Sequence, residues 1–197
     1  MQSWQKFIER YASLTPTEWA DVQARSHRRE VARNELYLQP GQVNKEFVFI
    51  DQGGLRVFQI TADGEEHTAW LAVEGQSFCD LSSFRQQIPT QLSVQALADT
   101  SLITLSYADM QHLYQTLPVW QEFGRKLWEE VSVNLIGMIL SFQAESAGVR
   151  YERISQNYTL LQTAPLKFVA EFLGITPHTL SRLRRYASRR QSKRQKL

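Results

Sequence analysis

The side chains best suited to recognition chemistry lie near the C-terminus, in the stretch PHTLSRLRR at residues 177–185. On a helix, Leu180 and Leu183 share one face, so the opposite face carries imidazole, hydroxyl and guanidinium groups. A guanidinium can donate two parallel hydrogen bonds to O6 and N7 of guanine. We therefore expect a surface that reads double-stranded DNA, made of His178, Thr179, Ser181, Arg182 and Arg185.

Two of these assignments have alternatives. Arg182 is also compatible with a phosphate contact or a solvated position, and His178 with a plain exposed residue. Lys167, Arg189 and Arg190 suit phosphates better than bases, because phosphate contacts fix position without reading sequence.

The residues before this surface predict how it is held. Segment 166–173 has apolar and small residues at helical spacing, and Pro165 suits the first turn of that helix. Gly174 is suited to the left-handed end of a helix, and Thr176 and Pro177 are start signals for a second one. The spacing predicts a helix-turn-helix, although a plain helical hairpin has a similar pattern.

Two regions before this motif differ in the spacing of their apolar residues. Residues 1–26 have helical spacing, and Thr15, Pro16 and Glu18 provide the start signals of a second short helix. From Arg29 to Ser106, short alternating runs are separated by turn signals at intervals of roughly eight to twelve residues. This rhythm predicts an antiparallel β-roll, barrel or sandwich, and hence an α+β fold.

The longest predicted helix begins at Pro118 and runs to residue 143. Its apolar residues repeat every three or four positions, which is typical of either a buried core helix or a helix paired with its twin. Pairing is favoured because helix-turn-helix proteins usually present two recognition helices about 34 Å apart. The expected homodimer contacts are Phe123, Leu127, Val131, Leu135, Met138 and Phe142.

Composition excludes several other classes. The 197-residue chain has a net charge of +2, but residues 182–197 hold eight Lys or Arg and no acid. The single cysteine, Cys79, rules out an internal disulfide and a multi-cysteine metal site, so no metal is expected. No apolar run of about 18 residues and no secretory signal is visible, so we expect no membrane contact and a cytoplasmic location. No grouping of Ser, His, Asp or Cys has a recognisable catalytic motif, and we expect no enzyme activity.

The order of these parts, together with FLGITPHTLSRLRR at residues 172–185, resembles the Crp/Fnr family of bacterial transcription regulators. DLSSF and LSVQALADTSLITLS give weaker support in the roll. The resemblance implies a cupin-like or cyclic-nucleotide-binding-like roll, dimerisation through the long helix and operator binding by the last helix. It also makes RNA polymerase a candidate partner. Residues after 186 lack an alternating run, which resembles a short branch without a β-hairpin wing.

The organisation that follows has four parts. Residues 1–117 form a sensor-like roll with N-terminal helices, 118–143 the dimerisation helix, 144–186 the helix-turn-helix domain and 187–197 a flexible basic tail.

The resemblance weakens at the ligand site. Cyclic-AMP-responsive members carry Phe-Gly-Glu-Leu and, about ten residues later, Arg-Ser-Ala, whereas this chain has FCDL at 78–81 and TQL at 90–92. A phosphate without its cation loses several kcal/mol, so we predict that cyclic AMP does not bind and that no cofactor is needed. An unknown small ligand remains a candidate, near Asp80, Ser82, Ser83, Arg85 and His67. The alternative function is a ligand-binding or protein-interaction module whose helix-turn-helix no longer binds DNA.

Overall fold

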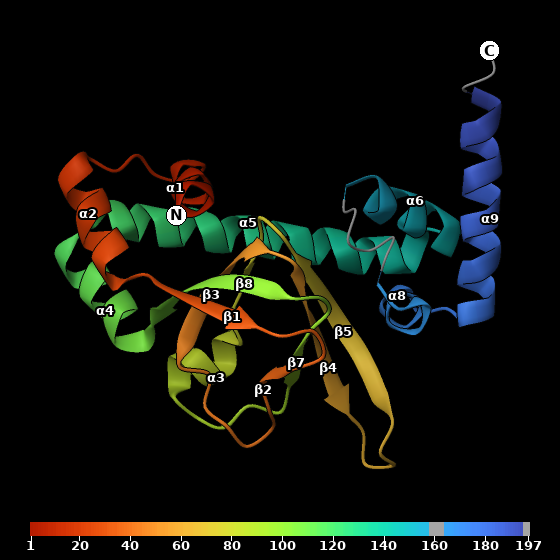
Figure 1. Cartoon of the computed structure of the whole chain (residues 1–197), viewed down its shortest axis with the longest axis horizontal. Coiled ribbons are helices and arrows are strands. Elements are labelled where there is room, and N and C mark those ends of the chain that lie inside the picture. Colours follow the sequence, from red (N-terminus) through yellow and green to blue (C-terminus); the bar gives the residue numbers. More distant parts are fainter. Residues whose placement is uncertain (158–163, 195–197) are drawn as a thin grey trace.

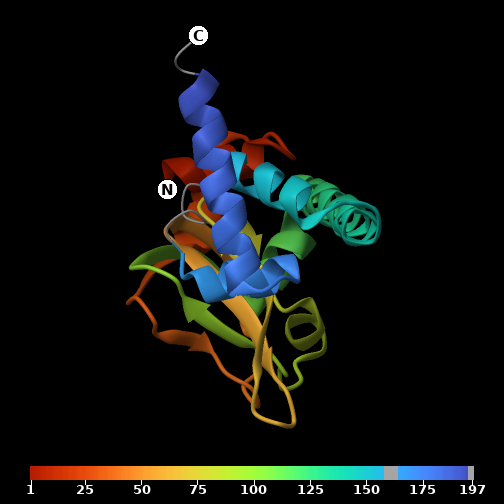
Figure 2. The same cartoon turned by 90° about the vertical axis from the view of Figure 1, so that its right-hand side faces the viewer.

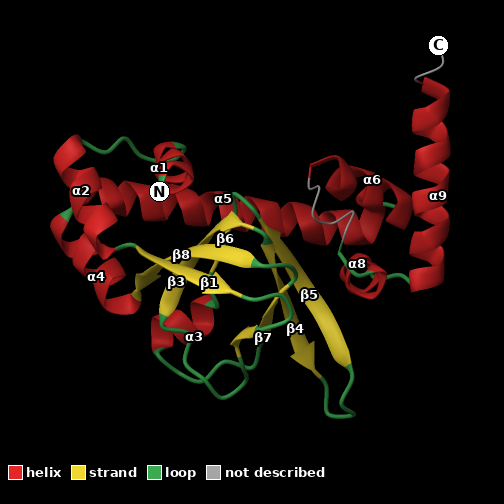
Figure 3. Cartoon of the chain, in the orientation of Figure 1, coloured by secondary structure: helices red, strands yellow, loops and turns green. Residues whose placement is uncertain are grey.

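Two antiparallel four-stranded sheets form the centre of the molecule (Figures 1 and 3). The computed structural model describes residues 1–157 and 164–194, with the backbone alone at Ile154, Gln156, Asn157 and 186–194. One sheet has the strand order β1-β8-β3-β6 and the other β2-β7-β4-β5. The strands are β1 (His27–Val31), β2 (Leu36–Leu38), β3 (Glu46–Gln52), β4 (Gly54–Ile60), β5 (Glu66–Val73), β6 (Ser77–Phe78), β7 (Ser93–Ala96) and β8 (Thr100–Ser106).

The apolar residues of these strands meet between the two sheets, where Val48, Ile50, Leu55, Val94 and Leu102 are completely buried. The α+β class with an antiparallel roll is therefore confirmed. Strand β1 was not expected, because its sequence HRREV has no apolar alternation; four of its five residues are exposed, and it pairs with β8 at one edge of its sheet.

The β4–β5 hairpin contains a bulge. Val57 pairs with Trp70, but the next residue, Phe58, pairs with Thr68, so Ala69 is an extra residue in β5. Such a bulge changes the direction of the side chains and amide groups around it. Strand β5 has no second strand neighbour and forms an edge of its sheet.

Short helices flank the roll: α1 (Gln2–Glu9), α2 (Pro16–Arg25), α3 (Leu81–Gln86) and α4 (Tyr107–Thr116). The expected start of α2 is confirmed, because Thr15 and Glu18 form a reciprocal capping box. Aromatic side chains from α1, β3 and the first turns of the long helix pack against one another in stacked, tilted and edge-on pairs. They include Trp4, Phe7, Phe49, Trp120 and Phe123.

The long helix α5 (Pro118–Ala144) passes along the roll and leads to α6 (Ala147–Asn157), α8 (Leu166–Leu173) and α9 (Pro177–Arg194) (Figure 1). Helix α9 continues to Arg194, so residues 187–194, expected as a flexible tail, are helical. At 1.5 Å per residue, α9 is about 27 Å long. Figure 2 shows its C-terminal half projecting beyond the rest of the molecule.

Candidate nucleic-acid interface

A tight turn joins α8 to α9. Gly174 has φ 67°, its N–H donates to Glu171 O at 3.0 Å, and Ile175 N–H donates to Ala170 O at 3.0 Å. The hydroxyl of Thr176 accepts from Thr179 N–H at 3.2 Å and caps α9. The expected glycine and threonine roles are confirmed, whereas Pro165 lies at the N-cap of α8 and not in its first turn.

The two helices are packed into one unit. Val169, Ala170 and Leu173 of α8 are buried together with Leu180 of α9, and Leu183 is partly buried beside them. Because Leu180 is fully buried, α9 cannot rotate about its own axis without opening this core. The orientation of α8 therefore determines where α9 points.

The remaining face of α9 carries the predicted base-contacting residues. His178, Arg182 and Arg185 are exposed, whereas Thr179 and Ser181 are half-buried. The backbone N–H and the hydroxyl of Thr179 both hydrogen-bond to the hydroxyl of Thr176, so Thr179 contributes to the N-terminal cap of α9.

Of the three residues predicted to contact phosphates, the structure describes the side chain of Lys167 alone. Lys167 lies on α8 and is exposed, with its Nζ 3.8 Å from Glu171 Oε1. Arg189 and Arg190 belong to α9, but their side chains lie outside the described part of the chain.

The predicted dimer contacts divide into two groups. Phe123 and Leu127 are buried in the core of their own chain, so the prediction that they contact a second copy was wrong. Val131 and Met138 are half-buried, while Leu135 and Phe142 are exposed. Four further apolar residues of α5, outside the predicted contact set, are also exposed: Val133, Ile136, Ile139 and Leu140.

A cavity of about 540 Å³ lies between the roll and α5. Most of its wall is apolar or aromatic, including Phe47, Trp70, Phe78 and Trp128. The arginine in its wall, Arg10, is 3.2 Å from Glu130 Oε1. Tyr11 donates to the same carboxylate at 3.1 Å, and burial raises the pKa of Tyr11 to about 12, so it stays a donor at neutral pH. Cys79 also lines the cavity, and burial raises the pKa of its thiol, which keeps it protonated.

The five residues expected near a ligand do not line this cavity. Asp80 caps α3 by accepting from Ser83 N–H at 3.3 Å, and it also accepts from Thr90 Oγ1 at 2.5 Å. The hydroxyl of Ser83 donates to Ile88 O and accepts from Asn44 N–H. These polar groups thus hold the 80–90 loop together. Ser82, Arg85 and His67 are exposed outside the cavity wall, so none of the five lines this cavity, and their assignment to a sensor pocket stays a prediction.

Residues 1–157 and 164–194 contain neither a candidate metal site nor a candidate membrane span. No group of three or more His, Cys, Asp or Glu could hold a metal ion. Among the same residues, none of the helices has the length and apolar character that a membrane span needs.

Residues 28–117 match the family model described as the cyclic nucleotide-binding domain. Comparison with curated protein sequences gives no match.

Three solved structures illustrate the similarity of fold. FixK2 from Bradyrhizobium japonicum is 14% identical with a TM-score of 0.67, covering 84% of this chain and 86% of its own. The c-di-GMP responsive global regulator CLP of Xanthomonas campestris is 15% identical with a TM-score of 0.63, covering 90% and 93%. The catabolite activator protein of Thermus thermophilus is 21% identical with a TM-score of 0.54, covering 91% and 86%. Residues 28–117 therefore resemble a cyclic nucleotide-binding domain in sequence and in fold, and the chain as a whole shares the fold of these three proteins.

Proposed function

We propose that this protein is a dimeric, sequence-specific DNA-binding regulator of transcription with no enzyme activity. One observation carries the proposal: α9 is anchored by Leu180 on one side and presents His178, Arg182 and Arg185 to solvent on the other. Guanidinium groups on an anchored helix can enter a major groove and pair with guanine. The resemblance to Crp/Fnr regulators and the fold shared with the three proteins above support this reading.

Dimerisation would supply the second recognition helix. The exposed strip of α5 is a large apolar surface for a water-facing helix, and such surfaces are usually covered by a partner. Its members are Val133, Leu135, Ile136, Ile139, Leu140 and Phe142. We assign the dimer seam to this strip, in place of the longer stripe that begins at Phe123.

The roll is proposed to work without a cyclic nucleotide. Where the resemblance implies an acid for the ribose and an arginine for the phosphate, this chain has Asp80 and Thr90, and Asp80 accepts a hydrogen bond from Thr90 Oγ1. In the cavity beside α5, which is a different place, Arg10 is paired with Glu130. A cyclic phosphate at the Asp80 position would lack the arginine that the resemblance implies there, because Thr90 is uncharged. Calorimetry with cyclic AMP and cyclic GMP should therefore show no binding at micromolar concentrations, and micromolar affinity for either would contradict this part of the proposal.

DNA recognition can be tested by selecting duplexes from a random pool with the wild-type protein and titrating binding against salt. The affinity should fall steeply with salt, because lysine and arginine side chains displace counterions from phosphates. Arg182→Ala should lose about 1–3 kcal/mol on the selected duplex and less on random duplex. Arg125→Ala is the matched control, because Arg125 is an exposed arginine on α5 whose loss changes the charge equally.

The two outcomes separate the possible functions. Equal losses on selected and random duplexes would remove Arg182 from the reading role. Salt-independent or undetectable binding by the wild type would favour the alternative, a ligand-binding or protein-interaction module.

A further inference from the structure

One arginine is buried where the α8–α9 unit meets the roll. Arg56 lies on β4 with only 1% of its side chain exposed. Its guanidinium donates to Thr68 Oγ1 at 2.8 Å, to Glu66 Oε2 at 2.7 Å and to Glu171 Oε2 at 3.1 Å. The first two partners belong to the neighbouring strand β5, but Glu171 belongs to α8. A fully buried cation is therefore shared between a carboxylate of β5 and a carboxylate of α8 that lies 115 residues later in the chain.

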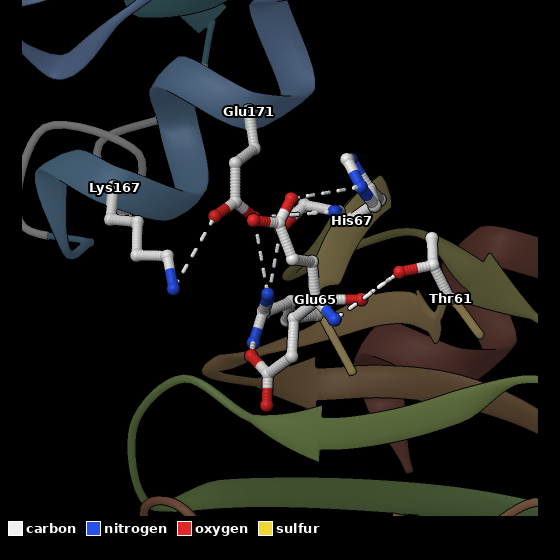
Figure 4. Close-up of polar contacts among 8 residues, drawn as sticks. Thr61, Glu65, His67, Lys167 and Glu171 are labelled. Atoms are coloured by element: carbon white, nitrogen blue, oxygen red, sulfur yellow. Dashed lines mark hydrogen bonds and ion pairs between the residues drawn. The ribbon is translucent and has the colours of Figure 1, made fainter. Parts of the chain in front are cut away.

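Glu171 in turn contacts the edge of the sheet directly. Its Oε2 accepts from Thr68 N–H at 3.2 Å and from Thr68 Oγ1 at 2.5 Å. Figure 4 shows Glu171 reaching down from its helix, with Lys167 beside it. An unpaired backbone N–H on an edge strand normally needs a partner. The bulge at Ala69 interrupts the regular ladder at this point, and Glu171 accepts the hydrogen bond from the adjacent Thr68.

Apolar contacts surround this polar cluster. The Arg56 guanidinium lies over the Phe168 ring of α8, 3.7 Å from its centroid, and over Phe58 at 4.1 Å. Trp70 of β5 meets Phe172 of α8 edge to face at 5.8 Å. Water is largely excluded from the Arg56 side of the cluster, so its electrostatic interactions are stronger than those of a surface ion pair.

We propose that Arg56 and Glu171 lock α8 onto the edge of β5 and that Arg56 is thereby a positioning residue for α9. The docking follows from the contacts themselves, whereas the consequence for α9 rests on the proposed DNA-binding function. Since α9 is packed rigidly on α8 through Leu180, fixing α8 also fixes the direction of the recognition helix.

The lock positions the reading face and does not hide it. In the locked arrangement His178, Arg182 and Arg185 are exposed. A dimer that binds two half-sites must hold two recognition helices at a set separation. Loss of the lock would let each α8–α9 unit reorient, and binding would then have to restrict that motion at a cost in affinity.

The docking can be measured without DNA in the full-length protein. Nitroxide labels at Gln42→Cys on the roll and Arg185→Cys on α9, in a Cys79→Ser background, report the distance between the two parts by pulsed EPR. An excess of unlabelled protein pairs each labelled chain with an unlabelled one, so that the measured distance lies within one chain. The distance distribution should be narrow in this background and several times broader after Glu171→Leu or Arg56→Met, because each variant removes the ion pair that joins β4 to α8 and leaves a buried or half-buried charge with fewer partners.

Two further variants make the result specific. Combining Arg56→Met with Glu171→Leu should restore the narrow distribution, since an apolar pair can replace a buried ion pair. Glu65→Gln is the matched control: Glu65 is an exposed carboxylate on the same hairpin, and its Oε2 lies 3.9 Å from His67 Nε2 (Figure 4). If Arg56→Met does not fold, Glu171→Gln tests the lock at Glu171, which is less deeply buried than Arg56.

The functional consequence is measured with unlabelled proteins that keep Arg185. On a duplex selected by the wild type, Glu171→Leu should lose at least about tenfold in affinity relative to Glu65→Gln, and the double variant should recover it. A narrow distribution in every variant would overturn the lock. Broad distributions with unchanged affinity would overturn the positioning role. If the wild type selects no duplex, the proposed function fails while the distance measurement still decides the lock.

Discussion

The two halves of α5 use the same kind of sequence for different purposes. In the first half, Trp120, Phe123 and Leu127 are buried in the chain's own core. The face turned away from this core is charged, with ion pairs between Glu122 and Lys126 and between Arg125 and Glu129. In the second half, the outward face is apolar instead and carries Val133, Ile136, Ile139 and Leu140.

The difference shows that apolar spacing alone does not identify what covers a helix. Both halves repeat apolar residues every three or four positions. The apolar side chains of the first half are buried or partly buried within the monomer, whereas those on the outward face of the second half are exposed. The chemistry of the outward face separates them: charges that pair at i and i+4 indicate solvent, whereas an apolar outward face indicates a second surface. A partner is therefore expected to cover residues 133–142 only.

The largest expected effect is on self-association. Replacing both Ile136 and Ile139 with aspartate should raise the dimer dissociation constant on the order of 1,000-fold, because each charge would be buried without a partner in both copies of a two-fold interface. Sedimentation equilibrium would measure the shift. The folded monomer should remain intact, since both isoleucines are more than half exposed, at 59% and 55%.

The control changes the same charge on the other half of the helix. Arg125→Asp also lowers the net charge by two, but Arg125 lies among the ion pairs of the first half. Its dimer should be as stable as that of the wild type. Equal dissociation by both variants would show that net charge, and not a seam at residues 133–142, governs association.

Geometry explains why the sequence predicted only part of this seam. An α-helix has 3.6 residues per turn, so residues spaced by four drift by about 40° at each step. The stripe from Phe123 through Leu127 and Val131 to Leu135 therefore winds around α5. It starts against the chain's own core and ends facing solvent. The prediction took this stripe to be straight, and it therefore assigned both ends of the stripe to the same partner.

Local signals predicted the fold better than they predicted contacts between distant segments. The capping box at Thr15, the left-handed Gly174 and the cap at Thr176 depend on neighbouring residues, and all three are confirmed. The roles of Asp80 and Arg56 depend on partners brought close by the fold. An arginine within the apolar strand LRVFQI was a visible signal that a buried carboxylate would be needed, but its partner Glu171 could not be found from spacing.

A smaller effect is expected in the first half of α5, where a substitution should lower the stability of the fold. Phe123→Ala should lower the free energy of unfolding by about 3–5 kcal/mol, because it leaves a cavity among Trp4, Phe7 and Trp120 that rigid rings cannot fill. Urea denaturation at a fixed protein concentration would measure the loss, since the stability of a dimer depends on concentration. Val133→Ala, at a position 67% exposed, is the control for an apolar truncation on the outward face. If Phe123→Ala weakened self-association of the folded protein more than it lowered stability, the division of α5 into a core half and a partner half would be wrong.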